Sequence, residues 1–248
     1  PVVVGITRTD GPAFNAEQVR FAAAAAYFRE RGLLTRFVDN RDFSSNPPKP
    51  GELAARMRQC HVIVLRTCEE GWHRFTPEER QCAERIGQAL EAFVASGGGL
   101  VLQVRPVRYQ NDEDEQFWNH ALAPLGARLL HEGVFDPSDA IEVAMGTHHR
   151  DRFFFTKNIL AHPVTAGVTG LWLPLHSYYP NAGTPAMAYG PEWTAVVKGG
   201  PQAKSFRSNA QRNEVELDQP GTYASEPPII AVRTLGKGRI VSVAIDEI

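Results

Sequence analysis

The sequence lacks paired cysteines, long apolar runs and a strong charge of either sign. Its three cysteines, Cys60, Cys68 and Cys82, form an odd set without close spacing, which argues against a disulfide framework or a structural zinc site. No apolar run approaches the ~20 residues that a membrane-spanning helix needs. The formal net charge of -2 gives no electrostatic basis for binding nucleic acid or an acidic membrane surface. We therefore expect no nucleic acid and no membrane among the partners.

Length and composition indicate one folded domain. A hydrophobic content of 43% and a charged content of 22% over 248 residues are ordinary for a soluble globular protein, and a single α/β domain over 1–248 is the simplest division. The chain starts at Pro1 and ends just after an apolar run at 240–245, so we expect it to be a fragment of a larger protein. The cellular location is left as two alternatives, the bacterial cytoplasm or export from the cell.

The first 110 residues alternate between short apolar strands and amphipathic helices. Strands are expected at 2–7, 35–39, 61–65 and 99–104, and helices at 16–31, 52–59 and 77–96. The last helix has the clearest start, because Thr76, Pro77 and Glu79 match the preferred N-cap, N1 and N3 residues. This alternation predicts the α/β core over 1–110, a flavodoxin-like open parallel sheet covered by helices on both faces.

Past Tyr109 the alternation stops. We expect a helix over 112–122 and a short strand at 128–130, within an irregular, loop-rich and β-rich elaboration over 111–226 that has no independent core of its own. Two apolar runs at 229–234 and 240–245 then flank a glycine-bearing turn. They predict a closing β-hairpin within 227–248.

The elaboration holds more apolar side chains than a helix-covered sheet can bury. They are Phe153, Phe154, Phe155, Leu171, Trp172, Leu173, Tyr178 and Tyr179. We expect part of this set to contact a neighbouring domain of the same polypeptide or a second subunit of a homo-oligomer, because large exposed apolar patches usually mark such contacts. The alternative is a satellite core beneath the loops.

Four stretches resemble the class I glutamine-amidotransferase-like superfamily, and especially its non-amidotransferase branches. Those branches include the trehalose-utilisation (ThuA-like) domains and the domain appended to some β-galactosidases. The stretches are 61–65, 76–101, 162–168 and 228–243, and the third, His-Pro-Val-Thr-Ala-Gly-Val, is similar to a segment found in those branches. The resemblance implies an amidotransferase-like α/β fold and an association with carbohydrate-active proteins.

The chain departs from the catalytic members of that superfamily at the residues that do the chemistry. Those members need a cysteine in the turn after the fourth strand and a His-Glu pair near the end of the domain. Here the turn reads Gln103-Val104-Arg105-Pro106, and the C-terminal region has no such pair. Because a thiolate is the nucleophile of that reaction, we expect no glutaminase activity and assign no catalytic residue. The resemblance then implies a degenerate domain that serves interaction, oligomerisation or ligand binding.

Polar residues follow the predicted strands at the sheet edge where open α/β folds bind ligands. Arginines and carboxylates that converge there could hold a small polar or sugar ligand, or serve a non-cysteine enzyme that acts on a sugar derivative. The alternative is an ion-pair network beneath loops. The candidate ligand-binding residues are Arg8, Asp10, Arg66, Glu69, Glu70, Gln103 and Arg105.

Three further sets of residues have either a packing role or a chemical one. Cys68 would need a base such as His73 to be reactive. His148 and His149 are adjacent, would face opposite sides of a strand and lack a third ligand at metal-binding spacing, and we expect no metal there or at His176. An aromatic platform for a sugar would draw on Trp172, Trp193, Tyr178 and Tyr179. We expect packing for most of these, no metal and no cofactor.

Overall fold

The computed structural model describes residues 2–8, 25–39, 52–67, 75–104, 112–145, 149–175, 183–209 and 214–245. Its central sheet has seven strands in the order β10-β13-β14-β4-β3-β1-β2. Five of them are parallel: β14 (Gly238–Val243), β4 (Gly99–Gln103), β3 (Val62–Arg66), β1 (Val3–Arg8) and β2 (Leu34–Asp39). The prediction that the first four strands of the chain share one parallel sheet is confirmed.

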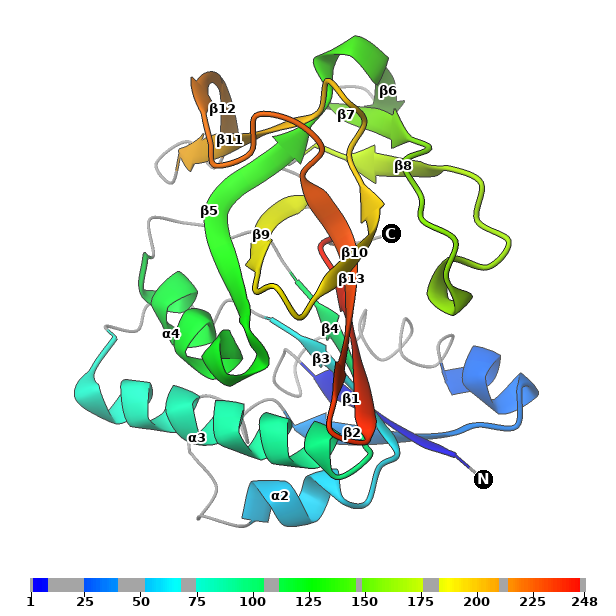
Figure 1. The fold of residues 1–248 in the computed structure, drawn as a ribbon, viewed down its shortest axis with the longest axis vertical. Coiled ribbons are helices and arrows are strands. Elements are labelled where there is room, and N and C mark those ends of the chain that lie inside the picture. Colours follow the sequence, from blue (N-terminus) through cyan, green and yellow to red (C-terminus); the bar gives the residue numbers. More distant parts are fainter. Residues whose placement is uncertain are drawn as a thin grey trace.

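Helices α2 (Glu52–Met57), α3 (Pro77–Ala95) and α4 (Asp112–Leu122) lie on one side of this sheet. The helical residues 25–30 lie on the other side (Figure 1). The remainder of the helix expected over 16–31 falls outside the described residues. Described helical residues therefore lie on both sides of the sheet.

Local capping rules explain both ends of α3. The Thr76 hydroxyl accepts a bond from the Glu79 N–H at 3.2 Å, and the Glu79 carboxylate accepts one from the Thr76 N–H at 2.8 Å, which is a complete capping box. At the other end, the Gly98 N–H donates to the Phe93 carbonyl and the Gly97 N–H to that of Val94. This Schellman pattern needs a residue with positive φ, and Gly97 has φ 120°.

The predicted hairpin forms from β13 (Pro228–Leu235) and β14, which pair antiparallel over six positions. Its turn packs on the end of α3, because the Lys237 N–H donates to the Ala95 carbonyl at 3.0 Å. β14 then enters the centre of the sheet beside β4. Together with β10 (Thr194–Lys198), which pairs antiparallel with β13, the hairpin extends the sheet on one edge.

The region after α4 is more regular than the sequence suggested. One four-stranded sheet has the order β12 (Glu214–Pro220), β11 (Lys204–Asn209), β5 (Ala127–Phe135) and β9 (Pro185–Tyr189). A second, three-stranded sheet has the order β6 (Ala140–Met145), β7 (His149–Thr156) and β8 (Leu171–Pro174). The expected strand at 128–130 is in fact the nine-residue β5, so the expectation of short strands and long loops was wrong here.

Two clusters of buried apolar side chains stabilise these layers. The first lies between the central sheet and helices α2 to α4, around Ile63, Leu65 and Leu90. The second joins the antiparallel strands to the extended edge of the central sheet and includes Phe154 and Ile229. Because Ile229 and Ile245 belong to this second cluster, the region 111–226 shares it with the C-terminal part of the chain.

Candidate functional site

The structure brings two of the predicted ligand-binding residues together at the carboxyl edge of the sheet. Arg66 and Gln103 are register partners at the ends of β3 and β4, and the Thr67 N–H donates to the Gln103 carbonyl at 3.0 Å. Arg8 ends β1 in the same sheet, but its side chain is outside the described set. Asp10, Glu69, Glu70 and Arg105 also fall outside the described residues, so a convergent cluster of all seven stays a prediction.

The position after β4, where the amidotransferase-like resemblance places a nucleophile, is occupied by Val104. This side chain is fully buried, and its N–H donates to the Val243 carbonyl on the neighbouring β14 at 2.9 Å. The chain therefore leaves β4 still bonded to the sheet and with an apolar residue facing the core. No part of Val104 is available to a substrate.

The two described cysteines are packing residues. Cys60 and Cys82 are both buried. Burial raises the pKa of the Cys60 thiol and outweighs the opposing effect of the nearby Arg36. A thiol with a raised pKa is a poor nucleophile at neutral pH. Cys68 lies outside the described residues.

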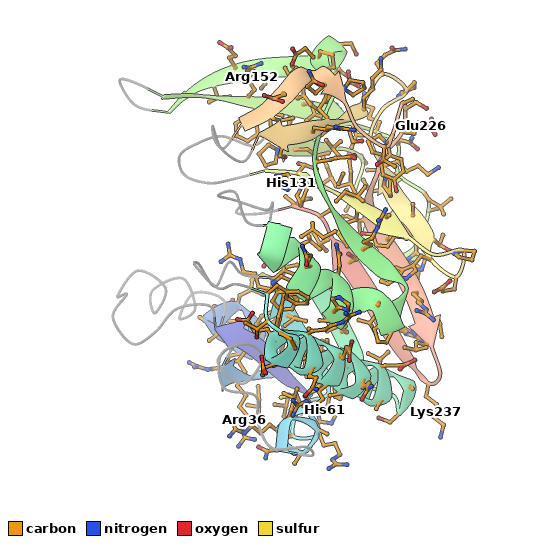
Figure 2. All side chains as sticks on the ribbon, turned by 90° about the vertical axis from the view of Figure 1, so that its left-hand side faces the viewer. Arg36, His61, His131, Arg152, Glu226 and Lys237 are labelled. Atoms are coloured by element: carbon orange, nitrogen blue, oxygen red, sulfur yellow. The ribbon has the colours of Figure 1, made fainter. Side chains whose placement is uncertain are left out.

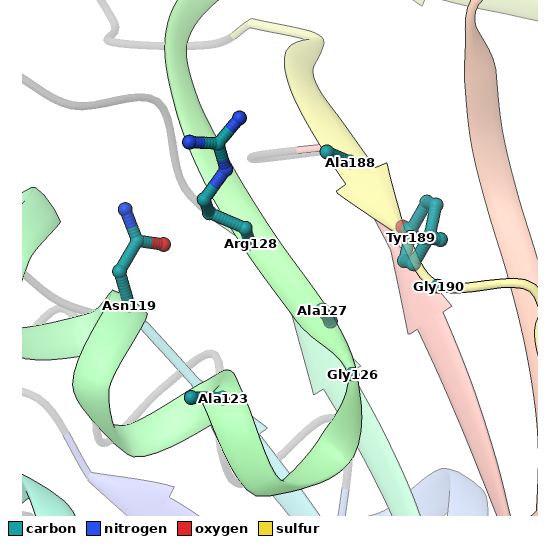
Figure 3. A pocket seen from close by; sticks show the side chains of 8 residues that line it. All are labelled: Asn119, Ala123, Gly126, Ala127, Arg128, Ala188, Tyr189 and Gly190. Carbon is teal, nitrogen blue, oxygen red and sulfur yellow. The ribbon is translucent and has the colours of Figure 1, made fainter.

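An open pocket of about 240 Å³ lies between α4, β5 and β9 (Figure 3). Its lining consists of Asn119, Ala123, Gly126, Ala127, Arg128, Ala188, Tyr189 and Gly190. The sequence offered no signal for it, because these residues come from separate elements and are mostly small. Its volume is below the usual ~300–1,000 Å³ of a ligand site.

Two polar side chains of this pocket serve the fold. The Asn119 amide donates to the Leu129 carbonyl at 3.1 Å and accepts from the Leu129 N–H at 2.8 Å, so it fastens α4 to β5. The Tyr189 side chain is half-buried beside the pocket, and its hydroxyl donates to Ser242 Oγ at 2.9 Å. Burial raises the pKa of this hydroxyl above its ordinary value. The hydrogen-bonding groups of these two side chains are therefore already used by the fold.

The other candidate residues separate into structural and exposed ones. Trp193 is buried and its Nε1 donates to the Leu125 carbonyl at 2.8 Å, so it is no sugar platform. His162 Nδ1 accepts from the Val164 N–H at 3.1 Å and fixes the His-Pro turn. Trp172 is 49% exposed. The side chains of Tyr178, Tyr179 and the histidines at 148, 149 and 176 are outside the described set.

One face of the three-stranded sheet presents apolar side chains to solvent. Register pairs Ile141 with Phe153 and Phe155 with Trp172, so these four residues share a face with Val143. We call this set the outer face. Ile141, Val143 and Trp172 are 44%, 37% and 49% exposed, and the rings of Phe155 and Trp172 lie 4.9 Å apart. The opposite face carries the fully buried Phe154 and Leu173, so the alternative of a satellite core describes that side. A partner contact at the outer face stays a prediction.

Within the described ranges, no three His, Cys, Asp or Glu side chains lie close enough to hold a metal ion. Among the described helices, none is both long enough and apolar enough to span a bilayer.

No protein-family model matches the sequence, and no curated protein is significantly similar to it. Solved structures are similar in fold. The cytoplasmic protein STM1381 from Salmonella typhimurium LT2 matches with a TM-score of 0.53 at 13% identity, covering 98% of this chain and 87% of that one. A putative ThuA-like protein from Parabacteroides merdae matches with a TM-score of 0.42 at 14% identity, covering 98% and 78%.

The exo-β-1,4-mannosidase Op5Man5 from an Opitutaceae bacterium matches with a TM-score of 0.44 at 10% identity. The match covers 98% of this chain and 31% of the mannosidase. The likeness to STM1381 shows a shared α/β fold, and the two lower TM-scores are too weak to support an inference about function.

Proposed function

We propose that this chain is an amidotransferase-like domain, of the ThuA-like and β-galactosidase-associated kind, that lacks glutaminase activity and acts as an interaction module. The order β2-β1-β3-β4-β14 of its parallel strands supports a flavodoxin-like arrangement. The observation that carries the proposal is the end of β4. An amidotransferase needs an exposed thiolate in this turn, and here the first residue beyond the strand is the buried Val104.

The two thiols that the structure describes do not supply the missing group. Cys60 and Cys82 are enclosed in the first hydrophobic cluster, and burial holds the Cys60 thiol in its protonated form by raising its pKa. A glutaminase also needs a base beside its thiolate. The sequence has no histidine after His176, which supports the loss of the His-Glu pair.

The rival function is an enzyme that uses non-cysteine chemistry on a sugar derivative at the carboxyl edge. It requires the predicted charged residues to line one pocket. Of the candidate residues, Arg66 and Gln103 have described side chains, and they are register partners at the ends of β3 and β4. The enzyme therefore stays the alternative proposal.

The outer face is the surface that supports an interaction role. Exposing large apolar side chains to water is unfavourable by roughly 25 cal/mol for each Å², and a set gathered on one sheet usually marks a contact. Sequence reasoning named Phe153, Phe155 and Trp172 in advance and missed Ile141 and Val143, which become their neighbours only through strand pairing. The partner we propose is a neighbouring domain of the same polypeptide or a second copy of the chain.

Incubation with glutamine tests the loss of chemistry. The chain should release no ammonia above a buffer blank, and a known glutaminase run in parallel controls the assay. Cys68→Ala is the matched variant, because the other two cysteines, Cys60 and Cys82, are buried in the core. Turnover by the wild type that disappears in Cys68→Ala would show that the nucleophile follows a different strand and would overturn the proposal.

A further inference from the structure

We infer that β6 is the contact strand of the interaction module, and that it pairs edge to edge with β6 of a second copy of this chain. The inference rests on the proposed interaction role and names its partner. The three-stranded sheet lies at the end of the molecule far from α2 and α3 (Figure 1). From the side, Arg152 of β7 lies near the end opposite the hairpin turn at Lys237 (Figure 2). A partner can therefore reach this sheet without meeting the helical layer.

β6 is a regular edge strand. It ends the order β6-β7-β8 and pairs with β7 over six consecutive positions without a register shift. Residues 140–143 are all exposed. The outer edge of such a strand carries a row of backbone N–H and C=O groups that can template another strand.

Other edge strands among the described residues carry features that block such pairing. β12 has several acidic side chains, a proline and a shifted register against β11, and β10 has a lysine and two register irregularities. β8 and β9 are short and contain a proline each. β2 presents the exposed Arg36. β6 reads Ala-Ile-Glu-Val-Ala-Met, with no proline, no lysine and no bulge.

The single charge on β6 is compatible with self-pairing. Glu142 lies opposite Arg152 of its own sheet, on the face away from Ile141 and Val143. In a two-fold antiparallel contact centred on Val143, Glu142 lies opposite position 144 of the partner, which is alanine in this sequence. Centring the contact on Glu142 would oppose two carboxylates, which is unfavourable. Charge therefore disfavours the register centred on Glu142. Of the two neighbouring registers, centring on Val143 pairs positions 141–145 of β6, whereas centring on Ile141 pairs only 140–142.

The register centred on Val143 also joins the outer faces. A two-fold axis perpendicular to the sheet keeps both outer faces on the same side, so Ile141 and Val143 of the two copies become neighbours in a six-stranded sheet. An isologous contact of this kind uses the same surface on both subunits and needs no second binding patch. Because one strand pair buries less than the roughly 1,200 Å² of a stable interface, we expect a concentration-dependent dimer.

Sedimentation equilibrium on the full chain tests the inference. The wild type should shift from monomer to dimer as its concentration rises, while Val143→Lys should weaken the dimer at least tenfold. Val143 is exposed, so a lysine there reaches solvent without entering the core, and far-UV circular dichroism should be unchanged. Trp172→Ala is the matched control, because it removes an apolar side chain from the same face two strands away from the edge.

Hydrogen exchange gives a second measurement. Amides of residues 140–145 should exchange more slowly at high than at low protein concentration, and this difference should vanish in Val143→Lys. If Val143→Lys unfolds the sheet, Ile141→Lys tests the same edge at a second exposed position.

Two results would overturn the inference. A wild type that stays monomeric at every concentration, with unchanged exchange over 140–145, excludes the second copy and leaves the interaction module with a neighbouring domain as partner. A dimer that survives Val143→Lys and is lost in Trp172→Ala would place the contact on the face instead of the edge. Ammonia release, in contrast, would overturn the proposed function and leave the edge contact untouched.

Discussion

Replacing Gly238 by alanine should strongly destabilise the domain. A Cβ at this position would lie well inside van der Waals distance of the backbone oxygens of Val94 and Gly98. Neither oxygen can move alone, because both belong to the capped end of α3. The hairpin must therefore shift away from the helix, which costs about 3 kcal/mol at the upper end of overpacking effects. The shift also breaks the bond from the Lys237 N–H to the Ala95 carbonyl, which contributes about 1 kcal/mol.

Urea unfolding followed by circular dichroism measures this loss. We expect a decrease of about 3–4 kcal/mol in the free energy of unfolding. The matched control is Gly32→Ala, because Gly32 has φ 73° and nothing within 4 Å of its Cβ position, so only the left-handed backbone costs about 1 kcal/mol. If Gly238→Ala were within about 1 kcal/mol of the wild type, or less harmful than Gly32→Ala, the hairpin and α3 would not be locked together as described.

Two further predictions concern Tyr189. Tyr189→Phe removes the bond to Ser242 Oγ and leaves that fully buried hydroxyl without its tyrosine partner, so it should cost about 1–3 kcal/mol in urea unfolding, and a wild-type midpoint would contradict this. Burial raises the pKa values of Cys60 and Tyr189 above their ordinary 9.0 and 10.0, so the unfolded chain loses these protons first and stability should fall as pH rises past 9 to 10. Tyr189→Phe should make the decline above pH 10 shallower, and an unchanged decline would refute the assignment to Tyr189.

The parts of the fold that follow from local rules could be predicted from the sequence. The start of α3 is encoded by Thr76 and Glu79, and its end by Gly97, all within one or two turns of the helix. The parallel strands are short apolar runs, which the sequence indicates directly, and β3 and β4 alternate buried with half-buried residues.

The antiparallel strands depend on partners that are far apart in the chain. β5 pairs with β9 and β11, which lie more than fifty residues away, and its burial does not alternate, because several of its adjacent residues are buried. Neither period 2 nor period 3.6 is visible in such a strand, so the sequence indicated only the short strand at 128–130. The same reason hid Ile141 and Val143, whose place on the outer face is set by pairing with β7.

The candidate site shows the same division. The sequence correctly placed Arg66 and Gln103 at the carboxyl edge, because each ends an apolar strand. The sequence could not show that Trp193 is buried and Trp172 exposed. Trp193 is held by its bond to the Leu125 carbonyl, sixty-eight residues earlier in the chain. Side-chain direction at a turn is set by tertiary contacts that spacing does not encode.

The central claim is that this chain, whose β4 is followed by the buried Val104, carries no amidotransferase nucleophile. Mass spectrometry after incubation with an electrophilic glutamine analogue, such as a γ-glutamyl diazoketone, tests it most directly. The reagent alkylates a glutaminase thiolate, the intact mass counts the adducts, and peptide mapping gives their position. The account predicts no adduct that excess glutamine competes away. One adduct per chain, prevented by glutamine and mapped to Cys68, would contradict it.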